Sequence, residues 1–157
     1  MFRWCCRTLP VGVVLTVIVP VALPPGVSSL EAQAPDSVIV VEVHYQADSA
    51  FALVLAAFEE AGIEVAIAST TQGLVLSATE RMGRRAPFAY AQFRADLVSL
   101  GPITRVLLRG IVSPSEDLDR PVTVTAGSFF QGALVWARLQ WVGRELKKTD
   151  IDRDSAP

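Results

Sequence analysis

Few residues in this chain carry the chemistry that most enzymes need. His44 is the only histidine, and the two cysteines, Cys5 and Cys6, both lie near the N-terminus. A histidine can act as a general base because its pKa lies near neutrality. However, no G-x-S-x-G motif and no second histidine accompany it, so the sequence does not indicate a nucleophilic triad. We interpret His44 as a polar residue within a strand and predict no catalytic residue.

Acidic residues gather in two places where they could take part in acid–base chemistry or bind a cation. Paired carboxylates act as acid and base when one of them is desolvated, and an EF-hand loop needs alternating ligands and a turn glycine. Neither pattern is present, and a single histidine with scattered acids falls short of a zinc site. The two groups are Glu59, Glu60 and Glu64, and Glu116, Asp117 and Asp119. We interpret both as solvated surface and, without a P-loop or a dinucleotide fingerprint, expect no metal or cofactor.

A predicted pair of strands, joined by a Ser-Leu-Gly-Pro turn, gives a sharper hypothesis about binding. If these strands pair through the turn, Arg94 lies opposite Arg105 and Tyr90 lies opposite Arg109, with Gln92 between them. Guanidinium groups in this arrangement would bind phosphates, carboxylates or an acidic protein surface. The alternative is a charged sheet face that serves only solubility, and a slip of one residue would scatter the set. Three further arginines could approach from the preceding loop: Arg81, Arg84 and Arg85.

Aromatic residues of the last predicted helix form a second candidate surface. Trp136 and Trp141 flank its apolar stripe on opposite sides, and Phe129 and Phe130 lie near its start. One helix face cannot bury all four, so either the helix sits deep against the sheet or an aromatic patch stays exposed. We favour packing in the core, whereas an exposed patch would mark a partner or membrane surface. The candidate binding residues are therefore Tyr90, Gln92, Arg94, Arg105, Arg109, Trp136 and Trp141.

One helix and the hairpin that follows it organise the predicted fold. Asp48 is a favourable N-cap and Gly62 a favourable C′ residue, which together predict a helix at 49–61. The hydrophobic period then changes from helical spacing to two, which predicts strands at 63–68 and 74–77. The apolar residues at helical spacing are Phe51, Val54, Leu55, Phe58 and Ala61.

The remaining elements complete an antiparallel sheet with helices on one face. Strands are predicted at 37–45, 88–97 and 103–112, with 122–125 as a short additional candidate and 79–87 as a polar link. A long helix follows from about Phe129 to Lys148, with Ser128 as its N-cap and an apolar stripe of Val135, Leu139, Val142 and Leu146. The order strand, helix, four strands, helix predicts an α+β domain with about five strands.

The N-terminal segment predicts export. Residues 1–34 combine early arginines, an apolar run at 11–23 and a small-x-small site at Ala32–Ala34, as a secretory signal peptide does. Because the run is short for a membrane span, we expect cleavage and no stable span afterwards, and an uncleaved N-terminal anchor is the alternative. The mature domain would then run from Pro35 to Lys148, followed by a charged tail at 149–157, in the periplasm or the medium. Given export and a net charge of −2, we expect no nucleic-acid partner, and the arginine-rich usage indicates a bacterial origin.

Residues 50–78 carry a resemblance to a known family. The stretch AFALVLAAFEEAGIEVAIASTTQGLVLSA combines a helix that ends at glycine, a strand, a polar turn with glycine and a second strand. It resembles helix-grip envelope domains of the outer-membrane assembly lipoprotein (BamC/NlpB) type, although the lipidated cysteine of that family has no counterpart here. The resemblance implies a curved sheet around the C-terminal helix and transfers no site residue. We predict a non-catalytic envelope binding or assembly module that binds an envelope protein. The alternative is a carrier that holds a small apolar or anionic ligand between sheet and C-terminal helix.

Overall fold

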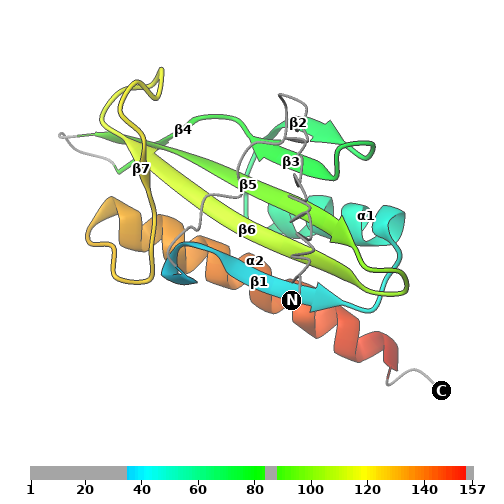
Figure 1. Ribbon diagram of the computed structural model, residues 1–157. Coiled ribbons are helices and arrows are strands. Elements are labelled where there is room, and N and C mark those ends of the chain that lie inside the picture. Colours follow the sequence, from blue (N-terminus) through cyan, green and yellow to red (C-terminus); the bar gives the residue numbers. More distant parts are fainter. Residues whose placement is uncertain (1–34, 84–87, 155–157) are drawn as a thin grey trace, which may run out of the picture. The chain divides into compact units, whose positions relative to one another are not determined.

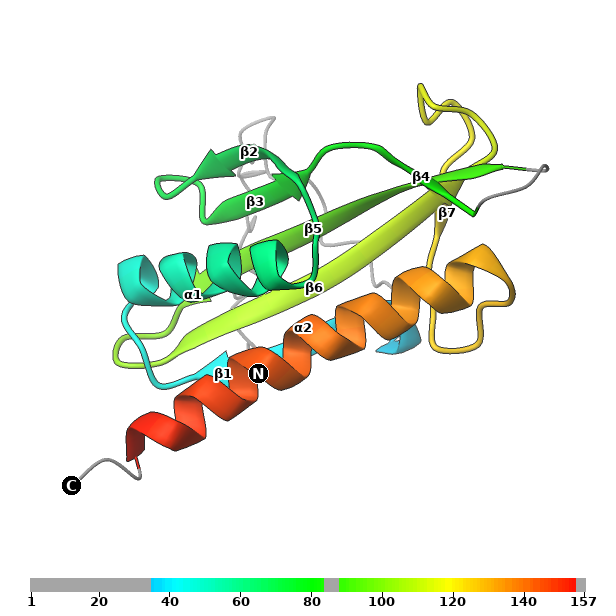
Figure 2. The same cartoon turned by 180° about the vertical axis from the view of Figure 1, so that it is seen from behind.

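The computed structural model describes residues 35–83 and 88–154, which form one antiparallel sheet of seven strands with two helices. Figures 1 and 2 show both helices on the same face of the sheet. This arrangement confirms the predicted α+β class, although the strands number seven instead of about five. The predicted signal peptide at 1–34, and Arg84 and Arg85, lie outside the described residues. Within the described residues, no helix is both long and apolar enough to cross a membrane.

The main path of the sheet runs in the order β1-β6-β5-β3-β2, and the short β4 and β7 pair with β5 and β6. A short 3₁₀ helix, η1, precedes the first strand (Pro35–Ser37). The strands are β1 (Ile39–Val43), β2 (Val65–Ser69), β3 (Leu74–Ser77), β4 (Glu80–Met82), β5 (Ala89–Ser99), β6 (Thr104–Ser113) and β7 (Val122–Thr123). The helices are α1 (Ala47–Glu60) and α2 (Gln131–Asp154). The sequence analysis did not predict β4, which lies in the predicted polar link, whereas β7 matches the short additional candidate at 122–125.

The first helix, α1, begins earlier than its sequence predicts. Gln46 is the N-cap and makes no side-chain cap hydrogen bond, so the predicted capping role of Asp48 was wrong. Asp48 lies in the first turn, where its negative charge is favourable next to the positive end of the helix dipole. The predicted end is confirmed: Gly62 adopts a φ of +64° and its N–H donates to the carbonyl oxygen of Glu59 at 2.8 Å.

The last helix, α2, is displaced along the chain relative to its prediction. It begins at Gln131, because the Ser128 hydroxyl accepts a hydrogen bond from the backbone N–H of Thr125 at 2.9 Å and so stabilises the preceding turn. It continues through Asp154, so the charged tail predicted from residue 149 is helical over its first part. The predicted apolar stripe is confirmed, and all four of its members are buried: Val135, Leu139, Val142 and Leu146.

The core lies between the helix layer and the inward side of the sheet. The inward side chains of the central strands alternate as the sequence predicts, and Ala91, Phe93 and Ala95 of β5 are fully buried. A glycine brings α2 close to β6: a Cβ at Gly110 would lie 2.6 Å from Cγ1 of Val135. Because both helices pack on this side, neither helix covers the opposite face of the sheet (Figures 1 and 2).

Candidate binding surfaces

The predicted arginine face exists, but its register was wrong. Arg94 of β5 lies opposite Arg109 of β6, and Arg105 lies opposite Val98. The Tyr90 side chain is paired with Ser113 instead of Arg109. The error is a shift of an even number of residues, so the side chains remain on the predicted face while their cross-strand partners change. The face therefore holds two adjacent arginines, with the third several residues further along the strand.

Two carboxylates form ion pairs with these three arginines. Asp96 pairs with Arg94 at 2.6 Å (Nη2 to Oδ1) and with Arg109 at 3.4 Å (Nη1 to Oδ2). Glu42 of β1 pairs with Arg105 at 2.6 Å. The hydrogen bond to Asp96 raises the pKa of Arg94, and partial desolvation opposes this rise. The arginine face is thus a set of ion pairs in which two carboxylates meet three guanidinium groups, which leaves one formal positive charge in excess.

One polar atom on this face has no partner within the described residues. The Nε–H group of Arg109 is buried and donates no hydrogen bond there, although the side chain as a whole is 23% exposed. Arg109 is one of the residues around a hollow of about 290 Å³ on this face. The hollow is lined by Leu76, Gln92, Arg94, Arg109, Gly110, Ile111 and Thr123. Arg94 and Arg109 bring two guanidinium groups to this lining, and guanidinium groups bind small oxyanions.

The aromatic residues near α2 divide into two pairs. Trp136 and Trp141 are half-buried and pack against the core, as the sequence analysis favours. By contrast, Phe129 and Phe130 are 83% and 85% exposed, so their expected burial was wrong. Phe130 also has a φ of +51°, a left-handed conformation that is unfavourable for a bulky residue.

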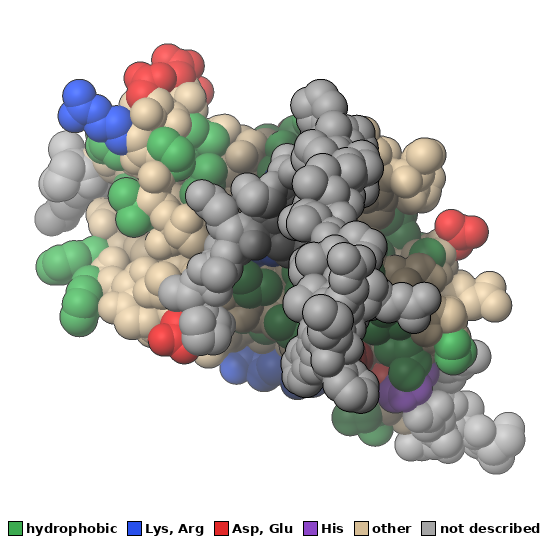
Figure 3. Space-filling model, viewed as in Figure 1, with side chains coloured by type: hydrophobic (Ala, Val, Ile, Leu, Met, Phe, Trp, Pro, Cys, Tyr) green, Lys and Arg blue, Asp and Glu red, His purple; other side chains and the backbone are tan. Residues whose placement is uncertain are grey.

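The two exposed phenylalanines belong to a larger apolar surface, which we call the phenylalanine patch: Phe88, Val122, Phe129 and Phe130. All four line one hollow of about 340 Å³. The guanidinium of Arg81 lies over the Phe88 ring, 4.7 Å from its centroid, and places a positive charge at the rim. Figure 3 shows hydrophobic side chains protruding at the end of the molecule where α2 begins.

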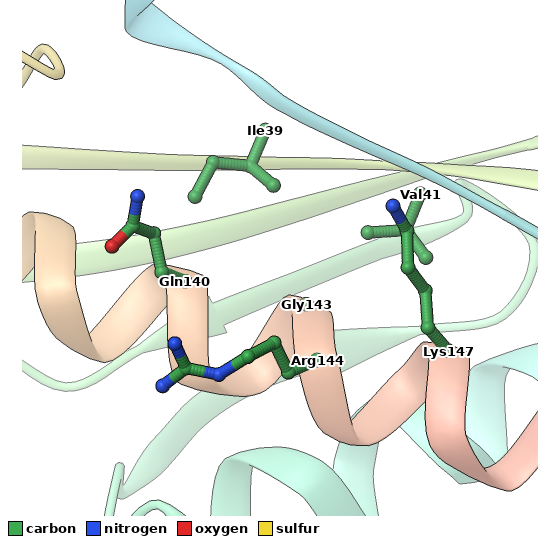
Figure 4. A pocket seen from close by; sticks show the side chains of 6 residues that line it. All are labelled: Ile39, Val41, Gln140, Gly143, Arg144 and Lys147. Carbon is green, nitrogen blue, oxygen red and sulfur yellow. The ribbon is translucent and has the colours of Figure 1, made fainter.

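A groove of about 300 Å³ separates β1 from α2 (Figure 4). Ile39 and Val41 form its apolar wall on the strand, and Arg144 and Lys147 extend from the helix on the other side (Figure 4). Gly143 of α2 faces the wall formed by β1, and a Cβ there would come within 3.3 Å of Ile39. The sequence analysis missed this groove. The recurrence of Gln140, Arg144 and Lys147 at helical spacing was the signal that could have shown it.

His44 meets a partner that its sequence position does not reveal. It lies directly after β1, whereas the sequence analysis placed it within a strand, and that prediction was wrong. Asp150 of α2 accepts the His44 backbone N–H at 2.7 Å and contacts the ring Nδ1 at 2.9 Å. The His44 side chain is 60% exposed, whereas that of Asp150 is 12% exposed. The pair ties the second half of α2 to the end of the edge strand.

The acidic groups singled out in the sequence lie on the surface, as predicted. Glu59, Glu60 and Glu64 are exposed, as are the three acids of the loop after β6. Among residues 35–83 and 88–154, no three potential metal ligands come together. A different acid has an altered pKa: burial raises the pKa of Glu80, while the ion pair with Arg138 opposes that rise. Arg138 also donates to backbone carbonyls at the end of α1, so this pair joins α2, α1 and β4.

Comparison of the sequence with protein-family models and with curated proteins finds no match to either.

Proposed function

We propose that this protein is an exported, non-catalytic module of the cell envelope that binds a partner protein through the phenylalanine patch. The signal-peptide pattern of residues 1–34 supports export, and the resemblance of residues 50–78 to outer-membrane assembly lipoproteins supports an envelope role. The predicted arginine face supports the proposal less, because Asp96 and Glu42 occupy its guanidinium groups.

The observation that carries the proposal is the conformation and exposure of Phe130. A left-handed conformation in a non-glycine residue costs of the order of 1–3 kcal/mol. Burial does not compensate for that cost, because 85% of the residue is exposed. Phe129, beside it, is exposed to the same degree. Aromatic side chains beside a hollow are typical of the central residues of protein interfaces.

Photo-crosslinking in the cells that make the protein tests this proposal. A benzophenone amino acid replaces Phe129 in one variant and Ile67 in the other. Ile67 is a matched control because it is 51% exposed and lies on β2, at the far edge of the sheet. We expect one discrete protein adduct from position 129 and none from position 67. The adduct should disappear when Phe130→Ser is added. Adducts of equal yield from both positions, or none from position 129, would refute the proposal.

The hollow at Arg109 favours a second candidate, a carrier for a small anion. The ligand would bind on the outer sheet face, because the interface between α2 and the sheet is filled by the buried apolar stripe of α2. Isothermal titration calorimetry with inorganic phosphate and with acetate checks this candidate. Binding that disappears in Arg109→Met, and persists in Arg105→Met, is the expected result. No heat of binding with either ion would exclude these two anions as its ligands.

A further inference from the structure

The groove between β1 and α2 lies beside the free edge of the sheet. All five residues of β1 pair with β6 on one side, and β1 ends the order of the main path, so among the described residues no strand pairs with its other side. An edge strand presents unpaired N–H and C=O groups that another extended chain can meet. The opposite edge strand, β2, has a shift in register between Val65 and Ile67, so its pairing with β3 is irregular there. The β1 register has no such irregularity.

The walls of the groove suit side chains from an added strand. Ile39 and Val41 point toward the helix layer and form an apolar floor beside the edge. The absence of a side chain at Gly143 lets α2 approach this floor closely, because a Cβ there would lie 3.3 Å from Ile39 and 3.4 Å from Val41. An edge strand flanked by a helix, with a side-chain groove between the two, is the arrangement in which β-strand addition recognises extended peptides.

The charge of the groove selects the occupant. Arg144 and Lys147 are exposed, and within the described residues no hydrogen bond or ion pair engages either head group. Neighbouring cations differ: Lys148 contacts Glu145 at 3.7 Å, and Arg138 pairs with Glu80. Among the basic residues of α2 whose side chains the structure describes, the two that line the groove are therefore the ones without an ion-pair partner.

We infer that this groove binds an extended, acidic peptide segment by β-strand addition to β1. The inference rests on the proposed function, since it names a second surface through which a binding module would hold a protein partner. The five residues of β1 match a segment of about five or six residues, at about 3.3 Å of rise for each. Its backbone pairs with the edge, alternate side chains enter the groove, and its carboxylates meet Arg144 and Lys147.

A synthetic peptide tests the inference on the purified exported protein. The probe is a fluorescein-labelled hexapeptide of alternating valine and glutamate, and its counterpart carries lysine in place of each glutamate. Fluorescence anisotropy measures affinity, and hydrogen–deuterium exchange locates binding. We expect saturable binding of the acidic peptide, at least tenfold weaker binding of the lysine peptide, and slower exchange of the amides of Ile39–Val43.

Charge-reversal variants separate the groove from general attraction to a basic surface. Arg144→Glu and Lys147→Glu should each weaken binding about fivefold, the effect of one exposed ion pair. Lys148→Glu makes the same change in net charge on the next residue of α2, outside the groove, and should weaken binding less than twofold. An equal loss in Lys148→Glu, protection elsewhere than β1, or no saturable binding of the acidic peptide would overturn the inference.

Two further outcomes complete the test. If exchange at Ile39–Val43 slows with rising protein concentration in the absence of peptide, the edge pairs with a second copy of the chain and the inference is wrong. The peptide does not report on the phenylalanine patch. Failure of the peptide test with an intact crosslink from position 129 therefore refutes the groove alone, whereas loss of that crosslink refutes the proposed function.

Discussion

Replacing Phe130 by glycine removes a phenyl ring and should nevertheless leave the protein as stable as before, or slightly more stable. The matched variant is Phe129→Gly, at a neighbouring residue that is equally exposed and lacks a positive φ. Both changes remove a ring and add the backbone freedom of glycine to the unfolded chain. Only the change at residue 130 also relieves a left-handed conformation.

The expected magnitudes follow from exposure. Phe130 is 85% exposed, so folding buries roughly 30 Å² of its side chain, which contributes about 0.8 kcal/mol. The added freedom of glycine costs about 0.5–1 kcal/mol. These terms are nearly equal at both positions and predict a loss of about 1.5 kcal/mol for Phe129→Gly. Relief of strain adds about 2 kcal/mol at residue 130 alone, so Phe130→Gly should change the free energy of unfolding by about +0.5 kcal/mol.

Urea unfolding followed by tryptophan fluorescence measures the difference. The two midpoints should differ by about 1 M, with unchanged slopes. Equal losses of stability in the two variants would show that Phe130 is not strained, and the central support for the phenylalanine patch would then be lost. If the patch binds a partner, Phe130→Gly should also lose the crosslink from position 129 while it keeps its stability, a separation that an unfolded variant cannot produce.

Three further variants test the packing and the electrostatics of the fold. Gly110→Ala should destabilise the protein by about 1–3 kcal/mol, measured by urea unfolding, because its Cβ would overlap α2. Burial raises the pKa of Glu80 above 4.5, so its contribution to stability is fully present below that pH and is lost as the pH rises through the raised pKa. Thermal unfolding measured at a series of pH values should therefore show a smaller fall in melting temperature across this window for Glu80→Gln than for the unchanged protein. Asp150→Ala should cost about 1–3 kcal/mol because it removes the acceptor for the His44 backbone N–H.

Each of these variants has a control elsewhere in the chain. Gly127→Ala meets no atom within 4 Å and should change stability by less than about 0.5 kcal/mol. Glu64→Gln and Asp152→Ala alter exposed acids and should leave the pH profile and the midpoint of unfolding as they are. A Gly110→Ala protein as stable as Gly127→Ala would contradict the close packing of α2 on β6.

The sequence predicts which face of each helix or strand is buried better than it predicts which residues lie opposite one another in neighbouring strands. The apolar stripe of α2 and the inward side of β5 follow from periods of about 3.6 and 2, because burial repeats with the geometry of each element. Register depends instead on the loop that joins two strands. The β5–β6 hairpin closes at Ser99 and Thr104, and the composition of the turn did not reveal that closing pair.

The start of α2 was mispredicted because a polar side chain there has another local partner. The hydroxyl of Ser128 bonds to the Thr125 N–H of the preceding turn, so α2 begins later. Serine and aspartate are favourable both in turns and at N-caps, and the sequence alone does not rank these uses. Gly62 was placed correctly because a left-handed residue after a helix has few alternatives to glycine. The strained Phe130 could not be foreseen, because its conformation opposes its residue type.

The pair of His44 and Asp150 is where a catalytic interpretation would have to begin, since a histidine beside a shielded carboxylate is the arrangement of a general base. The carboxylate is present, but His44 lines none of the hollows described above and its side chain is 60% exposed. Asp150 also accepts the backbone N–H of His44, a bond that does not require the imidazole. If the pair serves to hold α2 against β1, Asp150→Ala should destabilise the protein more than His44→Ala, which keeps that bond. The opposite result would support catalysis: His44→Ala keeps the full stability of the protein and the crosslink from position 129, but does not restore the cellular phenotype of a strain that lacks the protein.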